Sequence, residues 1–492
     1  MDTAFEKQSY MDHRLIWSGS IGGEENAECV VPDSMPDLGV IVDTDAILSL
    51  RSKDLSGGRL SVAADISVKI LYQPEGQSVL RSLSVSMSSS LTAAVTAEDD
   101  CIPLVRLRVR TAEAKLLNSR KASVRIELVG MGYCYQKRKL ELVSGVSACA
   151  CAVETLAESS TACLISDVRE KTFVLTDDFT LPAGLDDVEA ILTQRVTLTT
   201  DDMEFAGDKL VFRGRACSFL LLRQEENVYP CSYESSFSQI MEISGDVEPA
   251  PEITLALTGA YFDMPDHSGG KIGMELHLLA QVVCRKKAEL CYVADAYSNQ
   301  RVLKTEFSET ALCCRQRDAV VRHSISCTAE APREIGDILF ARGSVSSAVM
   351  GEDGIDLSVN LRAVYRRSDG GYGCISRRVQ ETVAVESGEG ESLCISGAAV
   401  TNVFSAVSAG GIDLRASVEL HLQAQCLSTL RHLSGLEAED DRLPDAPSVT
   451  LLRCAGEDEL WQLAKTHRST RAAILEANGG RSEGLLLIPK CR

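Results

Sequence analysis

Apolar and polar residues alternate along much of the chain. Between Leu60 and Tyr72 almost every second residue is apolar, and the same alternation recurs at residues 357–365 and 412–426. A period of two places successive side chains on opposite faces of a strand, so each segment is predicted to be a strand with one buried face. Almost no long helical pattern precedes residue 455. Many short strands separated by Gly, Ser, Asp and Pro turns favour antiparallel sheets.

The strands belong to a larger repeat. Three prolines open similar segments at intervals of 150 residues: Pro32, Pro182 and Pro332. An aspartate stands five positions after each proline: Asp37, Asp187 and Asp337. Because similarity at a fixed period marks repeated structural units, we predict a mainly β protein with three tandem antiparallel β-sandwich-like repeats.

The C-terminal residues have a different pattern, which predicts a separate small domain. Leu460, Leu463 and Ala464 follow the i, i+3, i+4 spacing of one helix face. Asp458 stands where a helix N-cap acceptor is expected, and Asn478 stands at the end of a second helix. With a short strand on either side, these helices predict a βααβ module. The predicted boundaries are an N-terminal tail at 1–12, repeats at 13–155, 160–305 and 310–435, an acidic linker at 436–448, and the module at 449–492.

Composition and charge narrow the classes of function. The 492-residue chain carries a net charge of −20, which argues against a general affinity for nucleic acid or anionic membrane. The N-terminus lacks the pattern of a secretory signal, and no run of 18 apolar residues predicts a transmembrane segment. We therefore expect a cytoplasmic protein whose 18 cysteines are mostly free thiols.

Patterns that carry catalysis or metal binding are few. The sequence contains no GxxxxGK[ST], HExxH or GxSxG, and its cysteines lack zinc-ligand spacing. His277 and His421 recur at matching positions, which a catalytic or metal site could explain, but the alternation assigns both to the polar face of a strand. We predict a non-enzymatic protein with no cofactor and no metal.

Three further features leave alternatives open. The recurring aspartates could form carboxylate sites, although local hydrogen bonds at a turn suit them better. Arg106, Arg108 and Arg110 share one strand face, which could bind an acidic partner or be an ordinary exposed face. Trp461 could fill the core of the module or anchor a partner. The acidic linker is expected to let the module reach a partner independently of the repeats.

The C-terminal module resembles the LysM family. The matching residues are Asp458, Leu460, Trp461, Leu463, Ala464, Ser469, Ile474, Leu475, Asn478, Gly484, Leu487, Ile488 and Pro489. LysM domains commonly bind N-acetylglucosamine polymers, so this resemblance implies a peptidoglycan-binding protein as one possible function.

The whole chain resembles the SipL/SPOCS-domain spore coat proteins of endospore-forming bacteria. The resemblance rests on the opening from Val31 to Asp37, the strand ending at Tyr72, and the stretch Asn118-Ser119-Arg120-Lys121. It implies a scaffold in spore coat assembly that acts in the mother cell, at the forespore surface. Its LysM-like domain would dock the basal coat layer, which is built by a self-polymerising ATPase, or other coat proteins. The predicted partner-binding residues are Asp458, Leu460, Trp461 and Asn478.

Overall fold

The computed structural model describes residues 3–98, 100–185, 187–243, 251–264, 270–330, 335–443 and 447–491. Within these residues the protein is mainly β, as predicted, and its sheets are antiparallel. The helices α1 (Glu457–His467) and α2 (Arg471–Ala477) lie near the C-terminus. Of the three repeat-opening prolines, Pro332 lies outside the described residues.

One strand order occurs three times along the chain. In residues 4–148 (unit 1), β1-β6-β5 and β2-β3-β4 form two three-stranded sheets. Residues 154–297 (unit 2) and 301–442 (unit 3) pair their corresponding strands in the same way. Unit 1 contains β1 (Ala4–Val30), β2 (Leu38–Ser56), β3 (Arg59–Pro74), β4 (Arg81–Ala94), β5 (Ile102–Asn118) and β6 (Lys121–Ala148). Unit 2 contains β7 (Glu154–Thr180), β8 (Ala190–Ala206), β9 (Lys209–Gln224), β10 (Asn227–Glu242), β11 (Glu252–Asp263) and β12 (Lys271–Tyr297). Unit 3 contains β13 (Arg301–Ala329), β14 (Ile335–Met350), β15 (Ile355–Arg367), β16 (Tyr372–Val383), β17 (Glu391–Ser408) and β18 (Gly411–Arg442).

The alternating pattern explains how the sheets pack. In unit 1 the apolar side chains of the central strands β3 and β6, among them Leu60, Ile66 and Ile126, are fully buried in one cluster. In unit 3 the corresponding strands β15 and β18 supply Leu357 and Leu420 to a second cluster. Fully burying such a side chain contributes about 1.5–3 kcal/mol, so these clusters hold the two sheets of a unit together.

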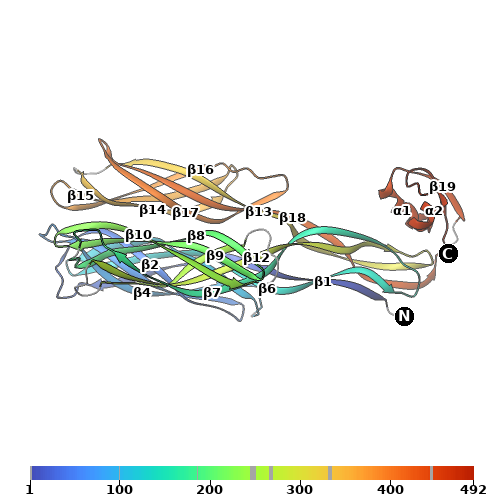
Figure 1. Ribbon diagram of the computed structural model, residues 1–492, viewed down its shortest axis with the longest axis horizontal. Coiled ribbons are helices and arrows are strands. Elements are labelled where there is room, and N and C mark those ends of the chain that lie inside the picture. Colours follow the sequence, from blue (N-terminus) through green and yellow to red (C-terminus); the bar gives the residue numbers. More distant parts are fainter. Residues whose placement is uncertain are drawn as a thin grey trace.

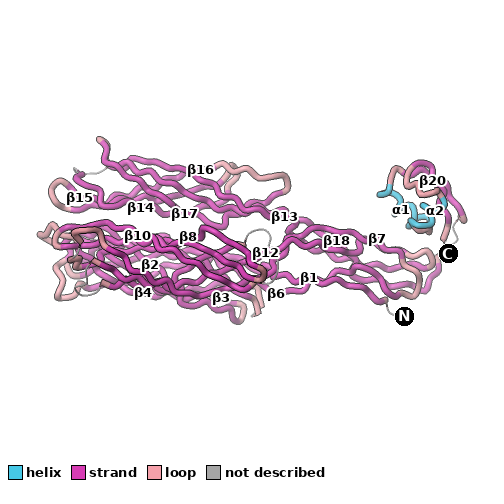
Figure 2. The backbone as a smooth tube through the Cα atoms, viewed as in Figure 1, coloured by secondary structure: helices cyan, strands magenta, loops and turns pink. Residues whose placement is uncertain are grey.

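The first and last strands of each unit extend beyond their sheets as two-stranded ribbons. Figures 1 and 2 show these ribbons as a narrow stalk that leaves the broader part of the molecule, which we call the head. Leu142, Leu290 and Leu430, one from each unit, are buried in a shared cluster that joins the ribbons. The stalk comprises residues 4–15 with 135–148, 154–165 with 285–297, and 301–313 with 427–442.

The stalk corrects two predicted boundaries. Residues 4–12, expected in an N-terminal tail, lie in β1 and pair with β6. Residues 436–442, expected in the acidic linker, lie in β18 and pair with β13. In both cases the backbone hydrogen bonds of a ladder hold a segment whose side chains are largely polar, and residue composition alone does not reveal such pairing.

A β-bulge marks the junction of head and stalk in every unit. The first strand carries one extra residue against the last strand: Ile16 in β1, Ser166 in β7 and Cys314 in β13. A bulge locally disrupts the ladder and increases the twist of the bulged strand. The three ribbons therefore leave the head at equivalent, locally distorted positions.

Ion pairs buried between the units lock the head. Asp43 of β2 accepts hydrogen bonds from Arg342 over 2.8 Å and from Arg362 over 2.7 Å, both from unit 3. Asp45 pairs with Arg195 of unit 2 over 2.5 Å and with Arg342 over 2.6 Å. The units also share a buried apolar cluster, to which Leu71, Leu221 and Val364 contribute one residue from each unit.

The predicted arginine face in β5 belongs largely to the same kind of interface. Arg106 forms an ion pair with Glu252 of unit 2 and donates to the carbonyl of Ser396 in unit 3 over 2.6 Å. Arg108 donates to the carbonyl of Val345 in unit 3. The interpretation of an ordinary exposed face is therefore wrong for Arg106, which other units of the same chain partly cover, whereas Arg108 stays exposed although it contacts unit 3.

Arg120 connects the two sequence motifs of unit 1, which are the opening from Val31 to Asp37 and the stretch from Asn118 to Lys121. Its guanidinium donates to the carboxylate of Asp37 over 2.9 Å, to the carbonyl of Met35 over 2.9 Å and to the carbonyl of Val31 over 3.0 Å. One arginine thus holds the whole loop between β1 and β2. Asp37 thus has a structural role, but its carboxylate binds an arginine 83 positions away rather than the local backbone donors that were expected of it at a turn.

Candidate docking site at the C-terminal module

The C-terminal module is built in the order strand, helix, helix, strand. β19 (Val449–Cys454) and β20 (Gly484–Pro489) pair antiparallel, and α1 and α2 lie between them in sequence. One face of this small sheet packs on the helices. Its buried core comprises Cys454, Leu460, Trp461, Ala464, Ile474, Leu486 and Ile488.

Local hydrogen bonds fix the two helices. The hydroxyl of Thr470 accepts the backbone N–H of Ala473 over 3.0 Å, which satisfies a donor at the start of α2. Arg468, at the end of α1, adopts a left-handed conformation with φ of 55°, and this residue turns the chain toward α2.

Asn478 ties the end of α2 to the sheet. Its amide nitrogen donates to the carbonyls of Ile474 and Leu487, each over 2.7 Å. Its side-chain oxygen accepts the backbone N–H of Leu487 over 2.8 Å. These bonds use the side chain inside the module, so Asn478 holds the fold together rather than forming part of its surface.

Trp461 is buried against the tip of the stalk. Its ring packs edge to face on Tyr297 of β12 with 4.8 Å between ring centroids, and it is only 5% exposed. Its indole nitrogen donates to the carboxylate of Asp295 over 2.8 Å. Lys465 pairs with the same carboxylate over 2.7 Å, and the hydroxyl of Tyr297 donates to the carbonyl of Ser469 over 2.9 Å.

These contacts seat the module on the end of β12. The expectation that the acidic linker lets the module move independently of the repeats is therefore wrong. Charge-assisted hydrogen bonds and an aromatic pair fix the module at the stalk tip, and Figure 1 shows its helices beside the end of the ribbons.

The four predicted partner-binding residues can now be placed. Leu460 is a fully buried core residue, whereas Asn478 and Trp461 are occupied within the chain as described. Asp458 is the second residue of α1, so the expectation that it stands at the N-cap is wrong, because Gly456 takes that position. Its side chain lies outside the described residues. The described three thus build and orient the module, and a direct role in partner binding stays a prediction.

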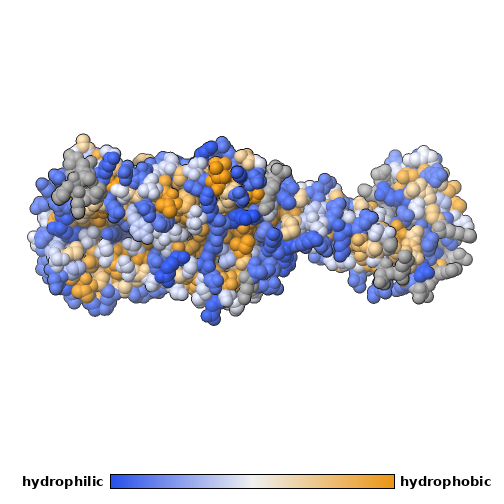
Figure 3. All heavy atoms as spheres, turned by 60° about the horizontal axis from the view of Figure 1, so that its bottom comes forward, coloured by the Kyte–Doolittle hydropathy of each residue, from blue (hydrophilic) through white to orange (hydrophobic). Residues whose placement is uncertain are grey.

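The other face of the small sheet is apolar and open. Val449 is 53% exposed, Leu451 58%, Leu485 61% and Leu487 38%. Leu451 pairs directly with Leu487, so these four side chains form one continuous patch, which we call the apolar outer face. Apolar residues are exposed on the module in the space-filling view of Figure 3. An exposed apolar patch on a folded protein commonly marks an interaction site.

The sequence contains a pattern that predicts this exposed apolar face, but the helical spacing in the same module drew attention away from it. Leu485, Leu486, Leu487 and Ile488 are apolar without interruption, although a two-stranded sheet on two helices buries only one of its faces. Arg453 lies on the same outer face, and residues 449–492 contain seven Lys and Arg against five Asp and Glu. The module is thus weakly basic within a strongly acidic chain.

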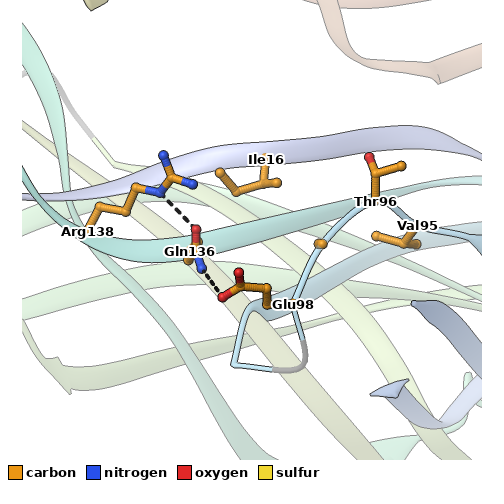
Figure 4. A pocket seen from close by; sticks show the side chains of 7 residues that line it. Ile16, Val95, Thr96, Glu98, Gln136 and Arg138 are labelled. Carbon is orange, nitrogen blue, oxygen red and sulfur yellow. Dashed lines mark hydrogen bonds between the residues drawn. The ribbon is translucent and has the colours of Figure 1, made fainter. Parts of the chain in front are cut away.

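A pocket of about 330 Å³ lies on unit 1 near the first bulge. Ile16, Val95 and Thr96 form part of its wall (Figure 4). The amide of Gln136 donates to Glu98 over 3.0 Å and its oxygen accepts from Arg138 over 2.8 Å. These polar side chains bind one another, and we assign no ligand to the pocket.

Other candidate sites give no assignment. Among the described residues, His, Cys, Asp and Glu side chains form no group of three or more that could hold a metal ion. No helix in the described part of the chain has the length and apolar character needed to cross a membrane. His277 is half-exposed and bonds to Glu275, and His421 is exposed, as expected for the polar faces of their strands. Comparison with family models, curated proteins and solved structures finds no match to the chain.

The contact between the C-terminal module and the stalk is expected to weaken in acid. Burial opposes ionisation of Asp295, but hydrogen bonds from Lys465 and Trp461 outweigh it and hold the pKa of the carboxyl below its ordinary value of 3.8. Such a group stabilises the seated module above its ordinary pKa, and the contribution is lost as the pH falls through the lowered value. Asp295→Asn is expected to weaken seating by about 1–2 kcal/mol at neutral pH, since Lys465 stays partly solvated.

The measurement is the emission of Trp461 during acid titration in a Trp17→Phe background. We expect a red shift at a higher pH, or already at neutral pH, in Asp295→Asn. Asp65→Asn, which removes an exposed ion pair with Arg51, is the matched control. Identical titration curves for Asp295→Asn and its parent would contradict the role of this carboxylate.

Proposed function

We propose that this protein is a non-enzymatic scaffold of endospore coat assembly that docks the basal coat layer through its C-terminal module. One observation carries the proposal: the module is seated at the end of a long stalk with its apolar outer face uncovered. The resemblance to SPOCS-domain proteins supplies the setting, which is the mother-cell side of the forespore surface. It also supplies the partner, the self-polymerising coat ATPase.

The arrangement suits a scaffold for a physical reason. Trp461 and Asp295 hold the module in one orientation, so less rotational freedom is lost when a partner binds than with a flexible tether. The shared cores and the buried ion pairs stiffen the head and stalk behind it. The proposal includes two further predictions. The three units are sandwich-like repeats, and the C-terminal module is LysM-like.

The test measures binding of the purified chain to purified coat ATPase. Leu451→Glu combined with Leu485→Glu is expected to lower affinity at least tenfold, which corresponds to about 1.4 kcal/mol. Glutamates at Val174 and Val320, which are 53% and 51% exposed on units 2 and 3, are the matched control and should leave affinity unchanged.

Circular dichroism and thermal unfolding must show that both double variants fold. Equal binding by the module variant and the parent would contradict docking through the apolar outer face. If the chain binds chitin oligomers but not the ATPase, the proposal fails in favour of glycan binding.

A further inference from the structure

The third ribbon carries two thiols where it leaves the head. Cys314 is the extra residue of the bulge in β13, and Cys426 of β18 pairs with the next residue, Arg315, so it lies across the ladder from the bulge. Cys426 is also the last residue of β18 that pairs with β17, at Glu391, so beyond it only β13 and β18 remain. The equivalent bulge residues of the other units, Ile16 and Ser166, carry no thiol.

The bulge brings these two side chains together. The thiol of Cys314 donates to the carbonyl of Cys426 over 3.1 Å, so its sulfur lies against the backbone of the second cysteine. Neighbouring strands of a sheet lie about 4.7–4.9 Å apart, and a disulfide needs Cα atoms about 4.4–6.8 Å apart. The pair is therefore close enough to be joined without separating the strands.

The neighbouring Cys313 is placed differently. Its thiol donates to the carbonyl of Arg315 over 3.3 Å, and burial raises its pKa to about 11. The backbone on either side of the pair is also fixed, because Glu391 of β17 binds Arg315 over 3.1 Å and Arg317 over 2.8 Å. Glu391 also pairs with Cys426, so these ion pairs link β13 to β17 across the strand that carries the second cysteine.

We propose that Cys314 and Cys426 form a reversible disulfide that staples the third ribbon at the junction of head and stalk. This site goes beyond docking by the C-terminal module and does not depend on it. The staple would link two strands whose thiols lie 112 positions apart in the chain. It would fix the bulge, which is the point where the three-stranded sheet becomes a two-stranded ribbon.

The oxidant is a low-molecular-weight disulfide such as glutathione disulfide. The thiolate of one cysteine attacks a sulfur of the oxidant, which forms a mixed disulfide and releases one glutathione thiol. The second cysteine then attacks the mixed disulfide and releases the other glutathione. The two protein thiols lose two protons and two electrons, and glutathione disulfide accepts both. Burial raises the pKa of Cys314, so the reaction is expected to be faster in mild alkali.

Tryptic mapping of the full-length chain tests the proposal. The reduced protein is incubated with glutathione disulfide at about pH 9, where more thiolate is present, and its remaining thiols are then alkylated. We expect one disulfide-linked pair of peptides, residues 305–315 joined to 416–431, whose only cysteines are Cys313, Cys314 and Cys426. Cys313→Ser should keep the linked pair, whereas Cys314→Ser and Cys426→Ser should each abolish it.

Thermal unfolding gives the second measurement. Oxidation is expected to raise the Tm of the parent by about 3 °C or more, and dithiothreitol should reverse the rise. Cys314→Ser should unfold at the same temperature in both states, with Cys313→Ser as the matched control that retains the shift. Persistence of the linked peptides in Cys314→Ser, or their absence from the oxidised parent, would overturn the proposal.

Discussion

Asp43→Asn is expected to destabilise the folded protein by about 3–5 kcal/mol. The side chain of Asp43 is only 3% exposed, and its carboxylate is shared by Arg342 and Arg362. An amide of the same shape removes the negative charge, so Arg362 loses this carboxylate partner and Arg342 keeps only Asp45 where units 1 and 3 meet. Because the cost of a buried unpaired charge exceeds that of a lost surface contact, this should be among the most damaging single changes in the head.

Urea denaturation followed by circular dichroism measures the effect. Asp65→Asn is the matched control, because its partner Arg51 and Asp65 itself are both more than half exposed. That surface pair should contribute less than about 1 kcal/mol. If the two variants unfold at the same urea concentration, the buried ion pairs do not lock the units as we describe.

Trp461→Ala is expected to cost about 3–5 kcal/mol in the stability of the seated module. The indole fills the core of the module and also covers Tyr297 at the stalk tip, so its removal opens both contacts. Hydrogen exchange is expected to become faster in α1, in β20 and at the end of β12. Exchange in the head should not change, because no core of the head includes this side chain.

Trp461→Phe separates packing from hydrogen bonding. Phenylalanine keeps an aromatic ring beside Tyr297 but cannot donate to Asp295, so it should cost about 1–2 kcal/mol. If Trp461→Ala leaves hydrogen exchange at the end of β12 unchanged, the module does not depend on the stalk for its position.

The apolar alternation was sufficient to predict the mainly β architecture. A side chain on a strand faces one side or the other, and the buried rows of β3, β15 and β18 are the alternating apolar rows of the sequence. The repeated spacing of Pro32 and Pro182 also agrees with the strand order that recurs in units 1 and 2. The elements of the C-terminal module were readable because helical spacing replaces alternation there.

The ends of the strands and the contacts between units could not be predicted from the alternation of apolar and polar residues. The ribbon segments 4–12 and 436–442 are held by backbone hydrogen bonds, which every sequence can make. Arg106 has the pattern of an exposed face, and only the packing of units 2 and 3 against β5 partly covers it. Exposure of a polar side chain depends on what lies opposite, and a partner hundreds of positions away leaves no local pattern.

At the candidate docking site, too, the sequence predicted the local elements but not the contacts between distant residues. By itself the sequence determined that residues 449–489 contain two short strands and two helices, because their apolar spacing matches these elements. It also singled out Trp461 as a large aromatic side chain in a small module. Only the tertiary structure decided that Trp461 faces the stalk while Leu451 and Leu485 face outward. The cause is the chemistry of β12, whose terminal Asp295 and Tyr297 offer an acceptor and an aromatic ring to the indole, and a contact of that kind exists only once the chain has folded.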